Sequence, residues 1–297
     1  MRLIKRLIFV VVGLVVLLVA AVALAIVFAN SIARKGIETG ATLALGVKTT
    51  LREADVGLLS GRFGLSGLDV ANPQGFKSPH FLALGRGEVS VSLASLNSPT
   101  VDIPSFALSD LDVSLERKGD GANYTAILDN LKRAQDAAGG SADPKAPKPA
   151  PSGEGKKFVI QNLVLRNIKI HADLVGGPIG DAAKVTVPID EIRLENVGKT
   201  GTGVGGTGVT MGQLTSIIVQ AVLAAATEKG AGIIPGAILG ELQGGLAGLD
   251  GLKNIPMKAL GDVKGAVEKA GQDAEKAVKQ GLDDVKKGIE NIIPGKK

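Results

Sequence analysis

An uncharged run near the N-terminus constrains this chain more than any other feature of its sequence. The run extends from Leu7 to Ala29 and consists almost wholly of Leu, Val, Ile, Ala and Phe. At about 1.5 Å rise per residue, it is long enough to cross a hydrocarbon core about 30 Å thick as one helix. A helix is expected because backbone amides in lipid must find partners within the segment. The candidate anchor residues on this helix are Leu7, Val15, Leu18, Val22 and Phe28.

The charges that flank this run predict its orientation. Three basic residues precede it and two follow it: Arg2, Lys5 and Arg6, then Arg34 and Lys35. The excess on the first side favours a cytoplasmic N-terminus, with the rest of the chain outside the cytoplasm. A cleaved signal peptide is the main alternative, because small residues at positions 21, 23 and 25 resemble a cleavage site. The length of the run favours a retained anchor, since signal-peptide apolar regions span about 7 to 15 residues.

The composition excludes several function classes. Lys and Arg number 34 against 29 Asp and Glu, and five basic residues flank the span, so the exported part is close to neutral. A nucleic-acid-binding role therefore lacks the basic field that it requires. The absence of cysteine excludes disulfides and thiolate metal sites. With 3% aromatic residues and no Trp, aromatic cages and base-stacking platforms are also disfavoured.

The first half of the exported chain shows both helical and strand periodicity. Residues 32–47 predict a helix leaving the membrane, with Ile37, Ala41, Ala44 and Leu45 on one side. Strands are predicted at 51–59, 63–70, 89–93, 101–108 and 112–116, where apolar and polar residues alternate. A proline after Ser78 suggests one helical turn over residues 80–84. A clearer helix begins at Asn123 and ends at Gly139 and Gly140.

The second half begins with a linker over Ala142–Lys157, which is rich in Pro, Lys, Gly and Ser. Two strands follow. The first has one apolar face, formed by Phe158, Ile160, Val164, Ile168 and Ile170. In the second strand the apolar positions are Val185, Val187 and Ile189, followed by Ile192 and Leu194. The alternation of apolar and polar residues therefore shifts by one position at Asp190 and Glu191, which indicates a bulge or bend.

The C-terminal third is mainly helical in pattern. Residues 214–227 predict a helix that lies on the second apolar sheet face and is too short to span a bilayer. Residues 230–252 are rich in Gly and predict no single element. Residues 258–293 carry a narrow apolar stripe typical of a long helix. This helical tail either packs on its own protein, remains partly disordered, or lies weakly on a membrane surface.

These elements predict the α+β class. A transmembrane helix is followed by a curved, groove-like antiparallel β-sheet with helices at its edges, and by a helical C-terminal tail. The predicted divisions are a cytoplasmic stub and anchor (1–33), a β-rich region (34–141), the linker (142–157), a second β segment with a packed apolar helix (158–229), and a Gly-rich segment with the amphipathic tail (230–297).

No motif in the chain predicts catalysis, a cofactor or a metal site. Gly201, Gly203 and Gly206 match the letters of a dinucleotide-binding loop, but the alternating strand before them and the lack of a strand afterwards do not fit. His80 and His171 are the only histidines and show no ligand spacing. No Gly-x-Ser-x-Gly turn is present. An enzyme would be reconsidered if the fold brought either histidine within ligand distance of two carboxylates.

Several segments resemble the N-terminal region of AsmA-like proteins. They are residues 67–76 (GLDVANPQGF), residues 89–96 (VSVSLASL), the strand that ends at Glu116, and the helix start at 121–124 (GANY). The resemblance covers about residues 1–133. It implies an inner-membrane anchor in bacteria with two membranes, and a periplasmic sheet that curls into a groove linked to outer-membrane biogenesis and phospholipid transport. This chain lacks the long repeated strands with which such a groove bridges two membranes.

The expected function is therefore a non-catalytic role in envelope lipid homeostasis or outer-membrane biogenesis, from the periplasmic side of the inner membrane. Membrane lipids are the expected partners, together with other envelope proteins, and nucleic acid is not. The candidate lipid-facing residues are Val89, Val91, Leu93, Val101, Ile103, Val113 and Leu115. The alternative is a membrane-tethered scaffold without a lipid ligand, because an alternating strand looks the same whether its apolar face meets a helix or a lipid.

Overall fold

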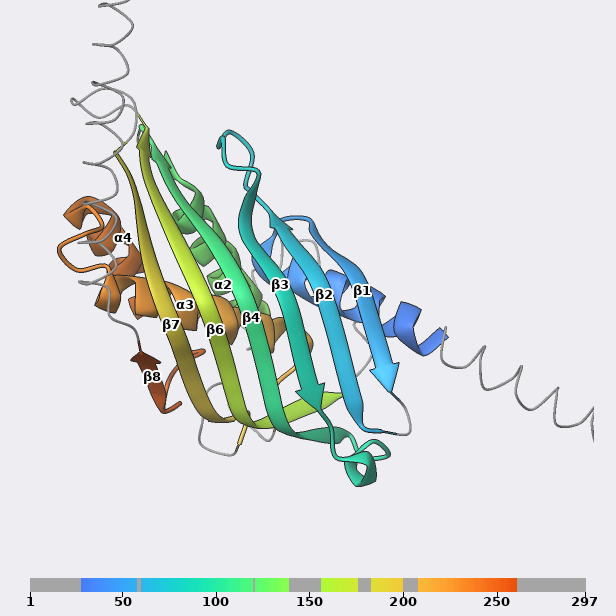
Figure 1. Ribbon diagram of the computed structural model, residues 1–297. Coiled ribbons are helices and arrows are strands. Elements are labelled where there is room, and N and C mark those ends of the chain that lie inside the picture. Colours follow the sequence, from blue (N-terminus) through green and yellow to red (C-terminus); the bar gives the residue numbers. More distant parts are fainter. Residues whose placement is uncertain are drawn as a thin grey trace, which may run out of the picture.

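The computed structural model describes residues 28–57, 60–119, 121–138, 156–175, 183–199 and 208–260. A large open sheet dominates this part of the chain (Figure 1). Its strands are β1 (Thr49–Gly57), β2 (Arg62–Ala71), β3 (His80–Ser90), β4 (Thr100–Lys118), β5 (Gly121–Ala122), β6 (Lys157–Val175), β7 (Ala183–Val197) and β8 (Met257–Leu260). They are ordered β1-β2-β3-β4-β6-β7-β8, and β5 pairs with β4.

Strands from both sides of the predicted linker belong to this one sheet, and one pair departs from the antiparallel prediction. β4 and β6 run parallel, from Thr100 beside Lys157 to Lys118 beside Val175. The chain between them contains helix α2 (Asn123–Ala138), which provides the long crossover that parallel strands require. Alternation of apolar and polar residues specifies a face of a strand but not its direction, so the sequence pattern did not reveal this pair.

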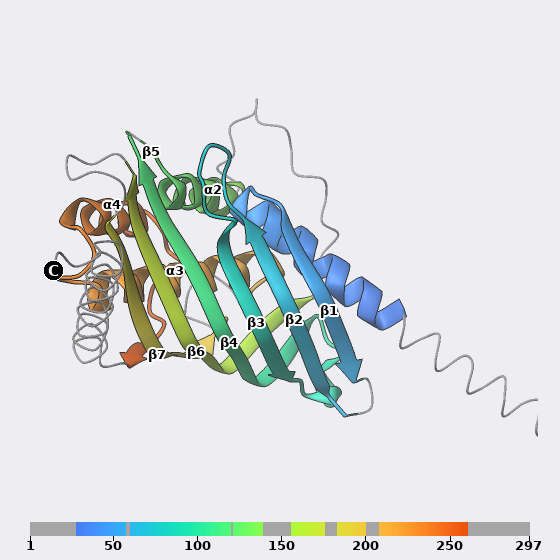
Figure 2. The ribbon, with the colours of Figure 1, turned by 45° about the horizontal axis from the view of Figure 1, so that its top comes forward.

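The helices cover one face of the sheet rather than its edges, as Figures 1 and 2 show. The helix of residues 28–45, α2 and α3 (Met211–Lys229) lie on this face, and α4 (Gly236–Ala247) packs on α2 and α3. The predicted apolar helix is confirmed as α3, which packs on β6, β7 and β8. Its N-terminus carries a capping box, in which Thr210 and Gln213 each accept a hydrogen bond from the other's backbone N–H.

The covered face holds the hydrophobic core, and the opposite face is polar. On the 28–45 helix, the predicted face of Ile37, Ala41, Ala44 and Leu45 is buried, and Ile37, Ala44 and Leu45 join the hydrophobic core. Between the buried apolar positions of β6 lie exposed Gln161, Arg166 and Lys169. An antiparallel sheet with one packed and one solvated face has this pattern.

A line of interrupted pairing crosses six adjacent strands. The ladders skip one residue in each strand, in the order Arg52, Gly67, Gly85, Asp110, Asn167 and Asp190. We call this the slip line. Three of its residues have left-handed backbones, with φ of 65° at Gly67, 63° at Asp110 and 51° at Asn167. Bulge-like irregularities of this kind bend a strand and shift its side chains to the other face.

The slip line explains a correct prediction and a wrong one. The predicted change of phase in β7 is confirmed, since the buried positions pass from Ile189 to Ile192. The same change in β6 passes from Leu165 to Ile168, which was not predicted. Val164 was therefore assigned wrongly to the apolar face with Ile168, and it lies half-buried between the buried Leu163 and Leu165.

Three local predictions are also corrected. Residues 80–84 begin β3 instead of forming a helical turn, because pairing with β2 and β4 outweighs the local proline signal. The strand expected over 89–93 ends at Ser90, and Leu93–Ser95 forms the short 3₁₀ helix η1. Residues 258–260 pair with β7 as part of β8 and are not helical. The rest of the predicted tail lies outside the described residues.

No helix among the described residues is long and apolar enough to cross a membrane. Most of the predicted anchor, from Leu7 to Val27, lies outside the part of the chain that the structure describes.

Candidate functional site

The sheet curls at the end where β1 turns into β2, which we call the hairpin end. At this end β3 finishes at Ser90, and β4 and β6 begin. Figures 1 and 2 show that the first residues of β4 and β6 turn away from the rest of their strands and run behind β3 and β2. A second interruption in the ladders, at Pro104, Gln161 and Asn196, lies where these strands turn. Proline has no N–H to donate to a ladder, which suits it to such a bend.

An apolar cluster lines the covered face at the hairpin end. Phe63 pairs with Val89, and Val89 pairs with Phe106, so three strands contribute one cross-strand row. The curled start of β4 and the residue after β3 add three more side chains. We call the set the hairpin-end cluster: Phe63, Val89, Val91, Val101, Ile103 and Phe106. Phe63 and Val91 are only half-buried, so apolar surface remains open at the rim of this cluster.

The seven candidate lipid-facing residues divide between two regions. Four of them belong to the hairpin-end cluster: Val89, Val91, Val101 and Ile103. Leu93 lies in η1 and is exposed. Val113 and Leu115 lie toward the other end of β4, fully buried in the half of the sheet against which α2 packs.

Sequence reasoning missed the two phenylalanines of the cluster. Phe63 fell within a predicted strand but was not assigned to the candidate set. Phe106 is out of phase with Val101 and Ile103, and the interruption at Pro104 places it on the same face. The available signal was the three-residue spacing from Ile103 to Phe106, which marks a break in strict alternation.

A buried polar network occupies the opposite end of the sheet and joins the residues on which the resemblance rests. The carboxylate of Glu116, which is fully buried, accepts hydrogen bonds from the backbone N–H of Lys77 at 2.8 Å and of Ser78 at 2.9 Å. The side chain of Asn123 accepts from the N–H of Glu116 at 2.8 Å and donates to Asn72 at 3.0 Å. The motif therefore fastens the β2–β3 loop to the start of α2.

The pKa of Glu116 reflects two opposing effects. Burial raises the pKa of this carboxyl, but hydrogen bonds from the Ser78 and Lys77 backbones and the Ser78 hydroxyl outweigh burial and hold the pKa below its ordinary value. The group is thus an ionised structural acceptor. The carboxylate accepts only from donors of the β2–β3 loop, namely the N–H groups of Lys77 and Ser78 and the Ser78 hydroxyl. This arrangement stabilises a loop rather than preparing an acid for catalysis.

A second carboxylate fixes the 28–45 helix against the edge of the sheet. Glu38 accepts a 2.8 Å hydrogen bond from the N–H of Leu51 on β1. This backbone hydrogen bond lowers the pKa of Glu38. Arg34 pairs with the same carboxylate at 3.2 Å. The 28–45 helix, which follows most of the predicted anchor in the sequence, is therefore joined to β1 by a specific contact.

The two histidines meet on the outer, polar face. His80 Nε2 lies 3.5 Å and His171 Nε2 lies 3.0 Å from the two oxygens of Asp112. His80 Nδ1 also lies 3.6 Å from Asp69. The two carboxylates thus face different nitrogens of His80, and one ion cannot bind both nitrogens of a single ring. Among the described residues, no group of three or more His, Asp or Glu side chains is arranged to hold a metal ion.

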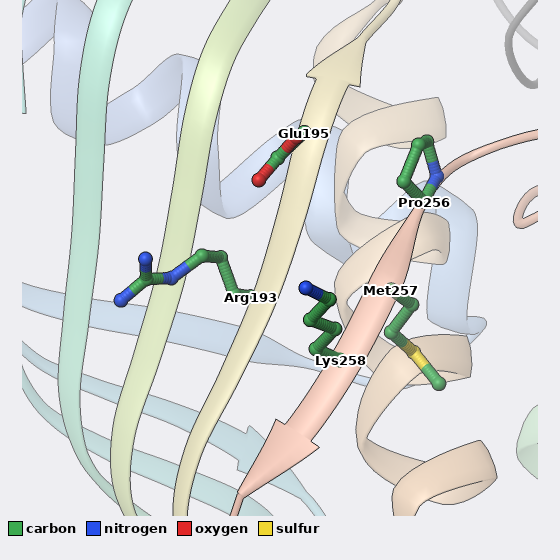
Figure 3. A pocket seen from close by; sticks show the side chains of 5 residues that line it. All are labelled: Arg193, Glu195, Pro256, Met257 and Lys258. Carbon is green, nitrogen blue, oxygen red and sulfur yellow. The ribbon is translucent and has the colours of Figure 1, made fainter.

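A small hollow lies at the β7–β8 edge, and Figure 3 shows the side chains that line it. The residues are Arg193, Glu195, Pro256, Met257 and Lys258, and the hollow has a volume of about 150 Å³. Small-molecule sites usually measure about 300–1,000 Å³. Arg193 extends toward β6 in Figure 3, and it pairs at 2.6 Å with Glu191, two residues earlier on β7. The hollow is thus a surface depression between charged side chains and carries no functional assignment.

Comparison with known proteins decides the family. The sequence profile of the AsmA family matches residues 1–190, which is well over half of the chain. The chain belongs to the AsmA family. The match extends beyond the region of the sequence resemblance, through β6 and into the first half of β7. No curated protein matches the chain.

The match to the AsmA family covers the structural features described above. The matched region contains the first six strands, the Glu116 network and the hairpin-end cluster. An AsmA-family chain has a role related to the cell envelope and outer-membrane biogenesis. Of the candidate anchor residues, Leu7, Val15, Leu18 and Val22 lie outside the described residues, whereas Phe28 opens the described part of the 28–45 helix and is exposed.

Proposed function

We propose that this AsmA-family protein is anchored in the bacterial inner membrane and takes part in envelope lipid homeostasis from the periplasm, without catalysis. Its working surface is the hairpin-end cluster, which takes up lipid acyl chains. The observation that carries this proposal is the half-exposed rim at Phe63 and Val91, next to an otherwise closed apolar core. Apolar surface covered by an acyl chain contributes about 25 cal/mol per Å².

The location of the cluster supports the same proposal. The start of β4 turns behind β3 and β2 (Figure 1), and its Val101 and Ile103 join the apolar core at the end of the sheet where Phe63 pairs with Val89. The cluster itself contains no charged residue, so it recognises acyl chains in general rather than a particular head group. A lipid held there is expected to be exchangeable and unselective.

A membrane-tethered scaffold is the second candidate function. It is favoured by the other half of the sheet, where the apolar face is occupied by the chain's own helices. Val113 and Leu115 are fully buried there, and α3 packs on β6 and β7. If the rim at the hairpin end is closed in the same way in solution, the protein holds partners at the membrane and binds no lipid.

Native mass spectrometry of the full chain, released from a mild detergent, separates the two functions. Val91→Asp places a carboxylate on the rim of the cluster. Val164→Asp is a matched control, because Val164 is also a half-buried valine but lies on the outer face of β6. Acyl-chain binding requires that the wild type and Val164→Asp retain phospholipid, and that Val91→Asp retains at least about tenfold less, the equivalent of about two methylene contacts.

The scaffold function makes the contrary prediction. It requires that no phospholipid remains bound to the wild-type protein, or that the bound amount is the same in all three proteins. Far-UV circular dichroism of each variant verifies that the sheet is intact, so that a loss of lipid is not a loss of fold.

A further inference from the structure

Three segments meet at the hairpin end. The N–H of Val56 on β1 donates a 2.8 Å hydrogen bond to the side chain of Asn30, near the start of the 28–45 helix. The N–H of Val91 donates a 2.7 Å hydrogen bond to the carbonyl of Gly61, in the turn between β1 and β2. Figure 2 shows the start of the helix beside the hairpin end of β1. The helix start, the β1–β2 turn and η1 therefore belong to one end of the molecule.

Exposed large apolar side chains gather at this end. Among the described residues, six such side chains are exposed, and four of them lie in these segments. The helix start contributes Phe28 and Ile32, with exposed fractions of 64% and 70%, and η1 and its C-cap contribute Leu93 and Leu96, with 46% and 40%. Scattered exposed leucines need no explanation, but a concentration at one end marks an interaction surface.

The turn that carries the two leucines is held in place. Ser92 donates its N–H to the carbonyl of Asp102, and the hydroxyl of Ser95 accepts from the N–H of Asp102, both at 2.9 Å. The ammonium group of Lys156 donates to the carbonyls of Leu96 and Ser98. Leu93 and Leu96 are thus presented to solvent by a fixed turn that is tied to the starts of β4 and β6.

The positive charge of the hairpin end favours an anionic partner. The described residues of the helix start (28–35), the β1–β2 end (55–63), the η1 segment (91–99) and the starts of β4 (100–103) and β6 (156–157) contain five basic residues and two acids: Arg34, Lys35, Arg62, Lys156 and Lys157, and Asp55 and Asp102. Basic side chains around exposed apolar groups are typical of surfaces that bind anionic lipid, where each contributes about 1 kcal/mol.

We infer that the hairpin end docks on the bilayer in which the chain is anchored, with Leu93 and Leu96 inserted at the boundary between head groups and acyl chains. The inference rests on the proposed membrane anchor. The apolar run ends at Ala29, and one helical turn covers about 5.4 Å, so the membrane surface lies close to Phe28 and to the segments beside it. Docking places the rim of the hairpin-end cluster next to the lipids that it takes up.

Site-directed spin labelling tests this inference on the full chain. The protein contains no cysteine, so a single introduced cysteine is a unique attachment site. Labels at Leu93→Cys and Leu96→Cys are compared in vesicles of phosphatidylethanolamine and phosphatidylglycerol. Leu43→Cys is the matched control, because it is 57% exposed on the same helix as Phe28 but about 22 Å farther along its axis. Val15→Cys reports on the anchor itself.

Docking predicts that the labels at positions 93 and 96 collide more often with oxygen than with a water-soluble nickel chelate, as a label in lipid does. The label at position 43 should show the reverse preference. The inference is overturned if labels at 93 and 96 behave as the label at 43 does while the label at 15 lies in lipid. If the label at 15 is also accessible to nickel, the anchor itself is wrong and the inference falls with it.

Discussion

The side-chain amide of Asn167 on β6 donates a 2.5 Å hydrogen bond to the carboxylate of Asp110 on β4. Both residues have left-handed backbones, with φ of 51° and 63°, and both lie on the slip line. Asn and Asp adopt this conformation more readily than other side-chain-bearing residues because they form local hydrogen bonds. The pair therefore marks the place where two long neighbouring strands change the face of their side chains together.

The left-handed conformation of Asn167 predicts different effects for two substitutions. Asn167→Gly and Asn167→Val both remove the hydrogen bond to Asp110, but only valine is strained at positive φ. We expect Asn167→Val to lower the free energy of unfolding by about 1–2 kcal/mol more than Asn167→Gly does. Chemical unfolding of the two variants measures the difference. Equal stability, or a more stable valine variant, would show that the slip line imposes no backbone strain here.

The slip line also explains how far the sequence predicted the fold. Period-two alternation located β1, β2 and most of β4, and helical spacing located the buried face of the 28–45 helix. Alternation alone did not predict that Leu108 and Leu111, three positions apart, lie on the same face of β4. A single break in the alternation of one strand cannot be told from random variation unless the neighbouring strands, which break at the same level, are known. The parallel pairing of β4 with β6 depends on contacts between residues 57 positions apart, which no local pattern records.

The candidate site was predicted only in part for the same reason. The residues before each interruption, such as Val101 and Ile103, were assigned from alternation, and they lie in the hairpin-end cluster. Phe106 lies after an interruption and was missed. The Glu116 network was visible in the sequence only as a family resemblance, since its members are separated by up to 51 positions, as in Asn123 and Asn72.

Glu116→Gln should destabilise the fold. The amide would retain one acceptor oxygen and would direct its NH₂ group at the donors of Lys77 or Ser78, leaving buried N–H groups without partners. We expect a loss of about 1–3 kcal/mol in the free energy of unfolding. Glu53→Gln is the control, because Glu53 is exposed and accepts one hydrogen bond, from Ser66 at 3.0 Å. A loss no larger than that of the control would mean that the network does not stabilise the loop.

The lowered pKa of Glu116 also predicts a pH dependence. A carboxyl whose pKa is lower in the folded state than its ordinary value of 4.5 stabilises the fold above that value, and this contribution is lost as the pH falls through the folded-state pKa. The thermal unfolding midpoint of the wild type should therefore fall as the pH is lowered from about 6 to about 3. Glu116→Gln should show a shallower dependence. Parallel curves for both proteins would contradict this assignment.

Tyr124→Phe should increase the local unfolding of α4. The buried hydroxyl of Tyr124 donates a 2.6 Å hydrogen bond to Glu241 on α4, and burial together with this carboxylate raises the pKa of the tyrosine. Removing a hydrogen bond to a charged group costs about 1.5–3 kcal/mol, so amide hydrogen exchange in α4 should accelerate about tenfold or more. The amides of α3 serve as the internal reference. Equal acceleration in both helices would indicate global destabilisation instead of local release.

The central claim, that the hairpin-end cluster holds acyl chains, is tested most directly by photocrosslinking in living cells. Phe63→benzoylphenylalanine places the reactive ketone at the rim of the cluster with little change of shape. Ala107→benzoylphenylalanine is the control, because Ala107 is half-buried on the outer face, between the buried Phe106 and Leu108. Acyl-chain binding predicts a phospholipid adduct, detected by mass spectrometry, at position 63 and none at position 107. No adduct at position 63, or equal adducts at both positions, would contradict it.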